Sequence, residues 1–186
     1  MVPHSIFCSL VVVACIGIGP ASAQDDHLPN DQHADCYHPE FAALDYLRGE
    51  WNVSGSVRMA DGEWDDVNGR SKIAPDLDGC VLIERYGDDR SAGQFSAIAV
   101  YSYDPIDGRL QKTWIDSAHG LATLYRGGTV DSKIVFSASK EIRGTGHHFV
   151  EEYEVDGSDG FIVQRRRATG DRTAWRAVSR VEYRRR

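Results

Sequence analysis

From Glu50 onward the sequence alternates between apolar and polar residues, and short turn sequences interrupt this alternation at regular intervals. The turns are built from Asp, Gly and Thr, and Asp and Gly tolerate positive φ. They are Asp61-Gly62, Asp78-Gly79, Asp107-Gly108, Gly127-Gly128, Asp156-Gly157, Asp159-Gly160 and Thr169-Gly170-Asp171. Between them we predict strands over 50–59, 63–74, 80–87, 94–103, 109–117, 121–126, 132–139, 147–155, 161–168 and 173–184.

Evenly spaced hairpins without intervening helices predict an all-β fold. The expected architecture is a single antiparallel up-and-down β-barrel of about 8–10 strands, because closure removes the exposed edges of a long meander. A two-sheet sandwich is the alternative, but it needs longer crossover connections than the sequence offers.

A short helix is predicted at one end of the barrel, before the first strand. Pro39 suits the first turn of a helix, and Gly49 ends it. Phe41, Leu44 and Leu47 are spaced to share one face. This face would cover the end of the barrel.

The helix leads into Leu47-Arg-Gly49-Glu-Trp51, and two further motifs follow: Gly79-Cys80, and Tyr101-Ser-Tyr103-Asp104 before Pro105-Ile-Asp-Gly108. This ordered set resembles the calycin superfamily of lipocalins and fatty-acid-binding proteins. More narrowly, it is similar to a bacterial lipocalin-like family of secreted and cytosolic proteins. The resemblance covers about residues 38–184. It implies a barrel that is plugged at one end and holds a small molecule inside.

The resemblance also assigns a structural role to a tryptophan. In lipocalins the Trp of this motif lies across the closed end, and an Arg of the last strand packs over the indole as a cation–π contact. Trp51 would take the first role, and Arg176 or Arg180 the second.

Residues 1–23 are predicted to be a cleaved signal peptide. Ile6 to Ile18 is an almost unbroken apolar run, and small residues follow it up to Ala23. The run is too short to span a membrane. Cleavage would leave a flexible polar leader over 24–37 and a lipocalin-like barrel domain over 38–186, in a secreted or periplasmic protein. Lipidation at Cys15 is the alternative, because Val12-Val13-Ala14-Cys15 resembles a bacterial lipoprotein box.

The cysteines and charges limit the classes of partner. Removal of the signal would leave Cys36 and Cys80 as one pair in an oxidising compartment, which predicts a disulfide. The net charge of −7 argues against a nucleic-acid partner. The Arg runs at 165–167 and 184–186 fit solvated strand edges or contacts with an anionic ligand. We expect a small hydrophobic or amphipathic molecule as the partner, with no membrane span, and the oligomeric state stays open.

Candidate binding residues follow from the alternation. On 94–103, Phe95, Ala97, Ala99, Tyr101 and Tyr103 share the face that we expect to point inward. Glu84, Glu151 and Arg165 each share a face with large apolar residues. Those charges either face water or point inward, where they must pair or meet a polar ligand. Trp114, Asp116 and His119 form a possible cluster at the barrel mouth. The ligand-binding candidates are Glu84, Tyr101, Tyr103, Trp114, Asp116, His119, Glu151, Tyr153 and Arg165.

No catalytic motif stands out. The chain has no Gly-x-Ser-x-Gly elbow, phosphate-binding Gly loop or His-Glu-x-x-His. His27, His33, Asp35 and His38 could bind zinc or copper, but a flexible tail binds weakly. Haem is disfavoured because the last two strands contain no His. We therefore predict no catalytic residue, metal or cofactor.

Three functions remain open. The leading hypothesis is a secreted or periplasmic binding protein that holds a small, largely apolar molecule. The second is a calycin-type enzyme, such as a cyclase, isomerase or decarboxylase, that uses acid or base residues in the same cavity. The third is a structural or protein-interaction barrel without a ligand. A buried acid or base favours the enzyme, a cavity of Tyr, Ala and aliphatic residues favours the carrier, and a filled interior leaves only the third.

Overall fold

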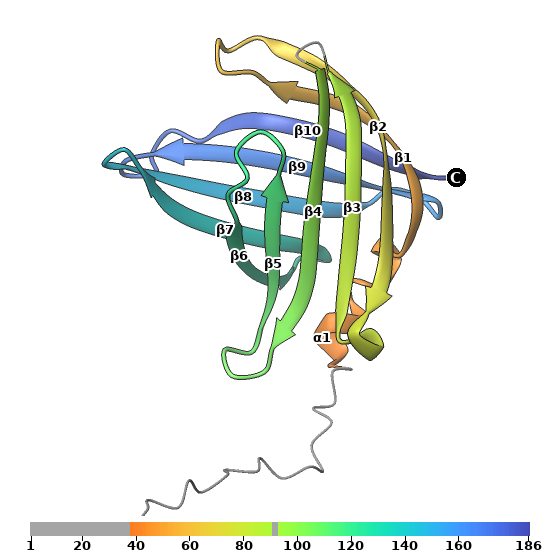
Figure 1. Ribbon diagram of the computed structural model, residues 1–186. Coiled ribbons are helices and arrows are strands. Elements are labelled where there is room, and N and C mark those ends of the chain that lie inside the picture. Colours follow the sequence, from red (N-terminus) through yellow and green to blue (C-terminus); the bar gives the residue numbers. More distant parts are fainter. Residues whose placement is uncertain (1–37, 91–92) are drawn as a thin grey trace, which may run out of the picture. The chain divides into compact units, whose positions relative to one another are not determined.

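The computed structural model describes residues 38–90 and 93–186, in which ten antiparallel strands close into a barrel (Figure 1). Each strand pairs with its neighbours in sequence, and β10 pairs with β1 to complete the ring. The strands are β1 (Gly49–Arg58), β2 (Trp64–Asp76), β3 (Val81–Arg90), β4 (Gly93–Asp104), β5 (Arg109–Asp116), β6 (Thr123–Val130), β7 (Lys133–Ile142), β8 (Thr145–Val155), β9 (Gly160–Thr169) and β10 (Arg176–Arg185). The predicted up-and-down barrel is confirmed.

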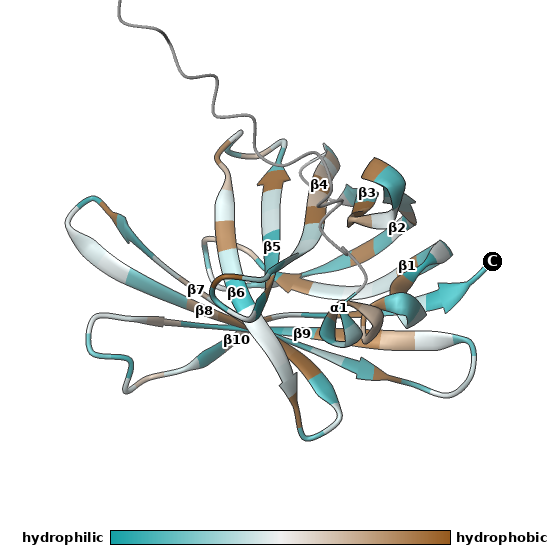
Figure 2. Ribbon diagram, turned by 90° about the horizontal axis from the view of Figure 1, so that it is seen from below, coloured by the Kyte–Doolittle hydropathy of each residue, from teal (hydrophilic) through white to brown (hydrophobic). Residues whose placement is uncertain are grey.

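One end of the barrel is plugged by the segment before β1. It consists of α1 (Pro39–Ala42) and the 3-10 turn η1 (Asp45–Leu47), so the predicted helix is present but divided. His38 caps α1 by accepting a hydrogen bond from the Glu40 N–H. Phe41, Leu44 and Leu47 are buried and belong to the barrel core. Figure 2, seen from this end, shows α1 against the strands.

Trp51 seals the same end. Its indole is 1% exposed and donates a hydrogen bond from Nε1 to the Leu47 carbonyl oxygen at 2.8 Å. The guanidinium carbon of Arg185 lies 4.5 Å from the ring centroid, so the expected cation–π contact exists but comes from another arginine.

Arg176 and Arg180 do not take the barrel-closing role. Trp51 pairs with Arg185 in the β1–β10 register, whereas Arg180 pairs with Ser56 further along β1. Arg176 begins β10 at the opposite end of the barrel. The sequence did not reveal this register, because several arginines of the last strand have similar spacing.

Gly49 allows Arg185 to reach the indole. A Cβ at position 49 would lie 2.6 Å from a guanidinium nitrogen of Arg185, and the backbone there has a φ of +143°. Both features favour glycine, since a side chain would clash and the conformation suits L-residues poorly. The Gly of the Gly-x-Trp motif thus serves the closure of the barrel.

The strands alternate between inward and outward residues, which gives the banded hydropathy along them in Figure 2. On β3 and β4 the buried inward residues are Leu82, Glu84, Tyr86, Ala97, Ala99 and Tyr101. The predicted inward face of β4 is therefore correct. The charged residues that sequence left open also point inward, because Glu84 and Glu151 are at most 2% exposed.

The signal peptide, the leader over 24–37 and Cys36 lie outside the described residues. Cys80 follows the 3-10 turn η2 (Leu77–Gly79) at the plugged end. The disulfide therefore stays a prediction. Within 38–90 and 93–186, no helix is long and apolar enough to cross a membrane.

Trp51→Ala should lower the free energy of unfolding by ~3–5 kcal/mol, because it removes a buried aromatic ring and leaves a cavity at the plugged end. Trp64 offers a matched control, since its side chain is 49% exposed. Trp64→Ala should cost less than about 1 kcal/mol. Equilibrium unfolding in urea measures both, and equal losses would contradict the sealing role of Trp51.

Candidate functional site

A cavity of about 710 Å³ occupies the half of the barrel away from α1. The β1–β2 hairpin, the start of the loop after β5 and the ends of β9 and β10 surround its opening, called here the mouth. Its lining residues come from seven strands and two loops: Val57, Arg58, Met59, Ala60, Asp61, Gly62, Tyr86, Phe95, Lys112, Trp114, Asp116, Ala118, His119, Phe149, Tyr153, Val163, Arg165, Arg167, Arg176, Val178, Ser179, Val181 and Tyr183. The interior is therefore hollow on this side and packed on the other.

The cavity floor contains a buried charge cluster. Lys112 Nζ lies 2.6 Å from Glu151 Oε2 and 2.6 Å from the Tyr153 hydroxyl. Arg165 donates from Nε to the other carboxylate oxygen of Glu151 at 2.7 Å. Glu151 is fully buried, Lys112 is 2% exposed and Arg165 is partly buried, so one carboxylate pairs with two cations and the cluster keeps a net positive charge.

The pairing of Glu151 with Lys112 and Arg165 shifts the pKa values of the cluster. Burial raises the pKa of Glu151, but Arg165 and Lys112 outweigh burial and bring it to about 2. For Lys112, burial lowers the pKa, and the attraction of Glu151 is partly offset by repulsion from Arg165. Glu151 is therefore held as an anion, while the Lys112 ammonium is the less stabilised partner of the pair.

Aromatic rings surround the Lys112 ammonium. Nζ lies 4.8 Å from the ring centroid of Trp114 and 5.3 Å from that of Tyr153. Such cation–π contacts partly replace the lost hydration of the ammonium group. The floor can therefore keep a positive charge that faces the cavity.

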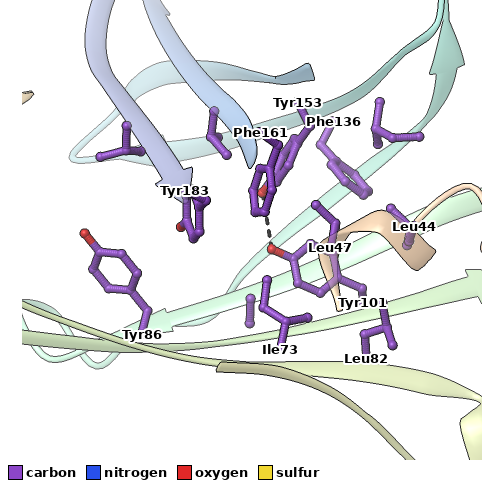
Figure 3. Packing of buried hydrophobic residues seen from close by; sticks show 14 of the residues in the cluster. Leu44, Leu47, Ile73, Leu82, Tyr86, Tyr101, Phe136, Tyr153, Phe161 and Tyr183 are labelled. Atoms are coloured by element: carbon purple, nitrogen blue, oxygen red, sulfur yellow. Dashed lines mark hydrogen bonds between the residues drawn. The ribbon is translucent and has the colours of Figure 1, made fainter. Parts of the chain in front are cut away.

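A second buried carboxylate lies beneath the cavity. Glu84 accepts hydrogen bonds from Tyr101, Ser71 and Tyr183 at 2.7, 2.8 and 3.1 Å. Burial and the neighbouring Glu84 raise the pKa of Tyr101 well above its ordinary value, so the tyrosine stays a donor. Tyr101 also contacts the Tyr153 hydroxyl at 3.4 Å, which joins the two carboxylate groups into one network (Figure 3).

At the mouth, Trp114, Asp116 and His119 come together as the sequence predicted. Trp114 Nε1 donates to Asp116 Oδ2 at 3.0 Å, and the His119 backbone N–H donates to Asp116 Oδ1 at 3.0 Å. Partial burial raises the pKa of Asp116, but these donors outweigh it and lower the pKa overall. The carboxylate thus fixes both the indole and the start of the loop.

The structure separates the predicted ligand-binding residues into two groups. The cavity is lined by Trp114, Asp116, His119, Tyr153 and Arg165. Beneath it, Glu84, Tyr101 and Glu151 hold the floor residues in place through hydrogen bonds.

Tyr103 is not among the residues that line the cavity, so its predicted ligand contact stays a prediction without support from this site. β4 runs from the mouth toward the plugged end, so its last residues lie beside α1. The Tyr103 ring stacks on His38 with centroids 3.9 Å apart. That stacking ties the helix cap to the barrel.

Sequence reasoning missed Lys112. It lies on the same strand face as Leu110, Trp114 and Asp116, at a spacing of two residues. Extending the face of Trp114 backward by one step would have found it. A lysine amid apolar residues was not expected inside, because burial of a charge needs a partner that sequence does not show.

No group of His, Cys, Asp or Glu in the described part of the chain is arranged to hold a metal ion. His27, His33 and Asp35 lie outside that part. Chemically, the cavity offers an aromatic wall, a lysine–tyrosine pair on its floor and several guanidinium groups near its mouth. Such a lining suits a small molecule with an apolar body and a polar end.

Comparison with known proteins places the chain in a family. A family model described as "Protein of unknown function (DUF1579)" matches residues 38–185. No curated protein matches the chain. Among solved structures, the S-type phycobiliprotein lyase CPES from Guillardia theta has a TM-score of 0.50 at 12% identity, over 77% of this chain and 90% of that one. At this identity the likeness shows the fold alone.

Removing the shared carboxylate should destabilise the barrel more than removing one of its cations. Glu151→Gln leaves the buried Lys112 and the partly buried Arg165 without an anion, which should cost about 3–5 kcal/mol. Lys112→Met keeps the pairing of Glu151 with Arg165 and should cost less than about 2 kcal/mol. Chemical denaturation measures both, and the reverse order would contradict the charge assignment.

The lowered pKa of Glu151 predicts that part of the free energy of unfolding is lost in acid. A pKa lowered from 4.5 to about 2 gives a contribution that is complete above about pH 4.5 and is lost as the pH falls toward 2. Its size is roughly 3 kcal/mol. The difference in stability between the wild type and Glu151→Gln should therefore shrink over this range, and a constant difference would contradict the lowered pKa.

Proposed function

We infer that this chain, which belongs to the DUF1579 family of proteins of unknown function, binds a small, largely apolar molecule in its barrel cavity. The observation that carries this proposal is the 710 Å³ cavity, which lies within the range of small-ligand sites. A barrel interior filled by side chains would instead have favoured a structural or interaction module.

The apolar residues of the lining indicate that the cavity holds a ligand and not only water. Phe95, Trp114 and Phe149 contribute aromatic surface, and Val163 and Val181 add aliphatic surface. Apolar surface that is kept from packing favours an apolar guest, because burial releases ordered water.

A calycin-type enzyme is the second candidate, and the lysine–tyrosine pair favours it. The Lys112 ammonium and the Tyr153 hydroxyl lie 2.6 Å apart and both line the cavity. A lysine with a lowered pKa beside a hydroxyl can exchange protons with a bound molecule. Conversion of a ligand that stops in Lys112→Met while binding persists would favour the enzyme, and recovery of the ligand unchanged would favour the carrier.

We also propose that the mature protein is secreted or periplasmic and contains a Cys36–Cys80 disulfide. The support comes from the apolar segment over 6–18 and the single remaining cysteine pair. Exported protein should have the intact mass of a chain that begins at Gln24, less two hydrogen atoms. A mass with lipid on Cys15 would contradict cleavage after Ala23, and two thiols reactive toward an alkylating agent would contradict the disulfide.

The neutral dye N-phenyl-naphthylamine should bind the purified protein with a rise in fluorescence, because the aromatic lining excludes water from the dye. Ser179 lines the cavity, so Ser179→Trp should fill part of it and weaken the binding at least about tenfold. Arg180 is the next residue on β10 and is exposed, so Arg180→Trp is the matched control. Equal binding by both variants would place the dye outside the barrel.

A further inference from the structure

The cavity lining has an excess of positive charge, whereas the chain as a whole is negative. Its lining includes two carboxylates, Asp61 and Asp116, and five cationic side chains, Arg58, Lys112, Arg165, Arg167 and Arg176. The Glu151 carboxylate beneath the floor pairs with Lys112 and Arg165, which still leaves cations in excess. The chain as a whole has a net charge of −7. A concave site of opposite sign to the rest of the protein attracts anions and concentrates them there.

Arg167 and Arg176 contribute to this positive charge as two arginines placed side by side. They are directly opposite each other in the register of β9 and β10, and both line the cavity at its mouth. Like charges in this relation repel. Among the described residues, neither arginine forms an ion pair, so no carboxylate of the barrel relieves the repulsion.

A backbone irregularity places Arg176 in this position. β10 alternates with Val181 and Tyr183 inward and Arg180 and Glu182 outward, so an even-numbered residue such as Arg176 would face solvent. The register shifts between Ala177 and Ser179, where Val178 forms a bulge, and this shift turns Arg176 to the cavity side, where it stays exposed at the mouth. Bulges re-aim side chains in this way beside binding and active sites.

We propose that Arg167 and Arg176 bind the carboxylate of an amphipathic organic acid whose apolar body enters the cavity. Two guanidinium groups on adjacent strands present donors to a planar carboxylate, a pairing that is stronger than neutral hydrogen bonds. Phe149, Trp114 and Val163 then receive the apolar part below the mouth. This proposal rests on the proposed ligand-binding function and adds the chemical class of the ligand.

The proposal is tested by displacing bound N-phenyl-naphthylamine with naphthaleneacetate or with its neutral near-isostere, naphthaleneacetamide. The wild type should bind the acid about tenfold more tightly than the amide, because only the acid gains charge-assisted hydrogen bonds. In the double variant Arg167→Gln/Arg176→Gln this preference should disappear, while dye affinity stays within about twofold. The variant should be at least as stable as the wild type, since it loses a repulsive pair.

Arg166 provides the matched control, because it is exposed on the same strand and pairs with Glu152. Arg166→Gln should keep the full preference for the acid. A wild type that binds acid and amide equally, or a double variant that keeps the preference, would overturn the anion site and leave the proposed function standing. A protein that binds none of the three compounds would overturn both proposals.

Discussion

The ion pairs of Glu151 are the interaction on which the interior depends. Lys112 on β5 and Arg165 on β9 both line the cavity, and this one carboxylate on β8 pairs with both. Without it, Lys112 and Arg165 would repel each other with no anion between them. With it, the barrel keeps a polar floor under an aromatic wall, so the cavity can recognise a molecule that is apolar along most of its length.

The two halves of the barrel have different roles. The plugged half is packed by α1, η1 and Trp51, and the Trp51 indole N–H donates to the Leu47 carbonyl oxygen. The open half keeps its space and holds most of the charge. The hydrogen bond between Tyr101 and Tyr153 connects the two (Figure 3), which lets a rigid core position the residues of the site.

Most of the fold follows from the local alternation of apolar and polar residues, whereas most of the site depends on how the strands pair. Alternation and turn residues sufficed to predict ten strand segments, the closed barrel and the inward face that contains Tyr101. They did not show which end of a strand lies at the mouth, so Tyr103 was placed in the site. Alternation and turn residues also did not show the bulge at Val178, which places Arg176 on the opposite side of the sheet from the one that alternation predicts. Lys112 was missed because its partner, Glu151, is 39 residues away.

The four tryptophans permit a direct test of where a ligand lies. Trp114 lines the cavity, Trp51 is buried at the plugged end, and Trp64 and Trp175 are 49% and 38% exposed. We would record nitrogen–proton correlation spectra during a titration with naphthaleneacetate, assigning the indole signal of Trp114 with Trp114→Phe. The account predicts a saturable shift of that signal while the Trp51 signal stays in place. A titration that moves Trp51, or leaves Trp114 unchanged, would contradict binding in the barrel cavity.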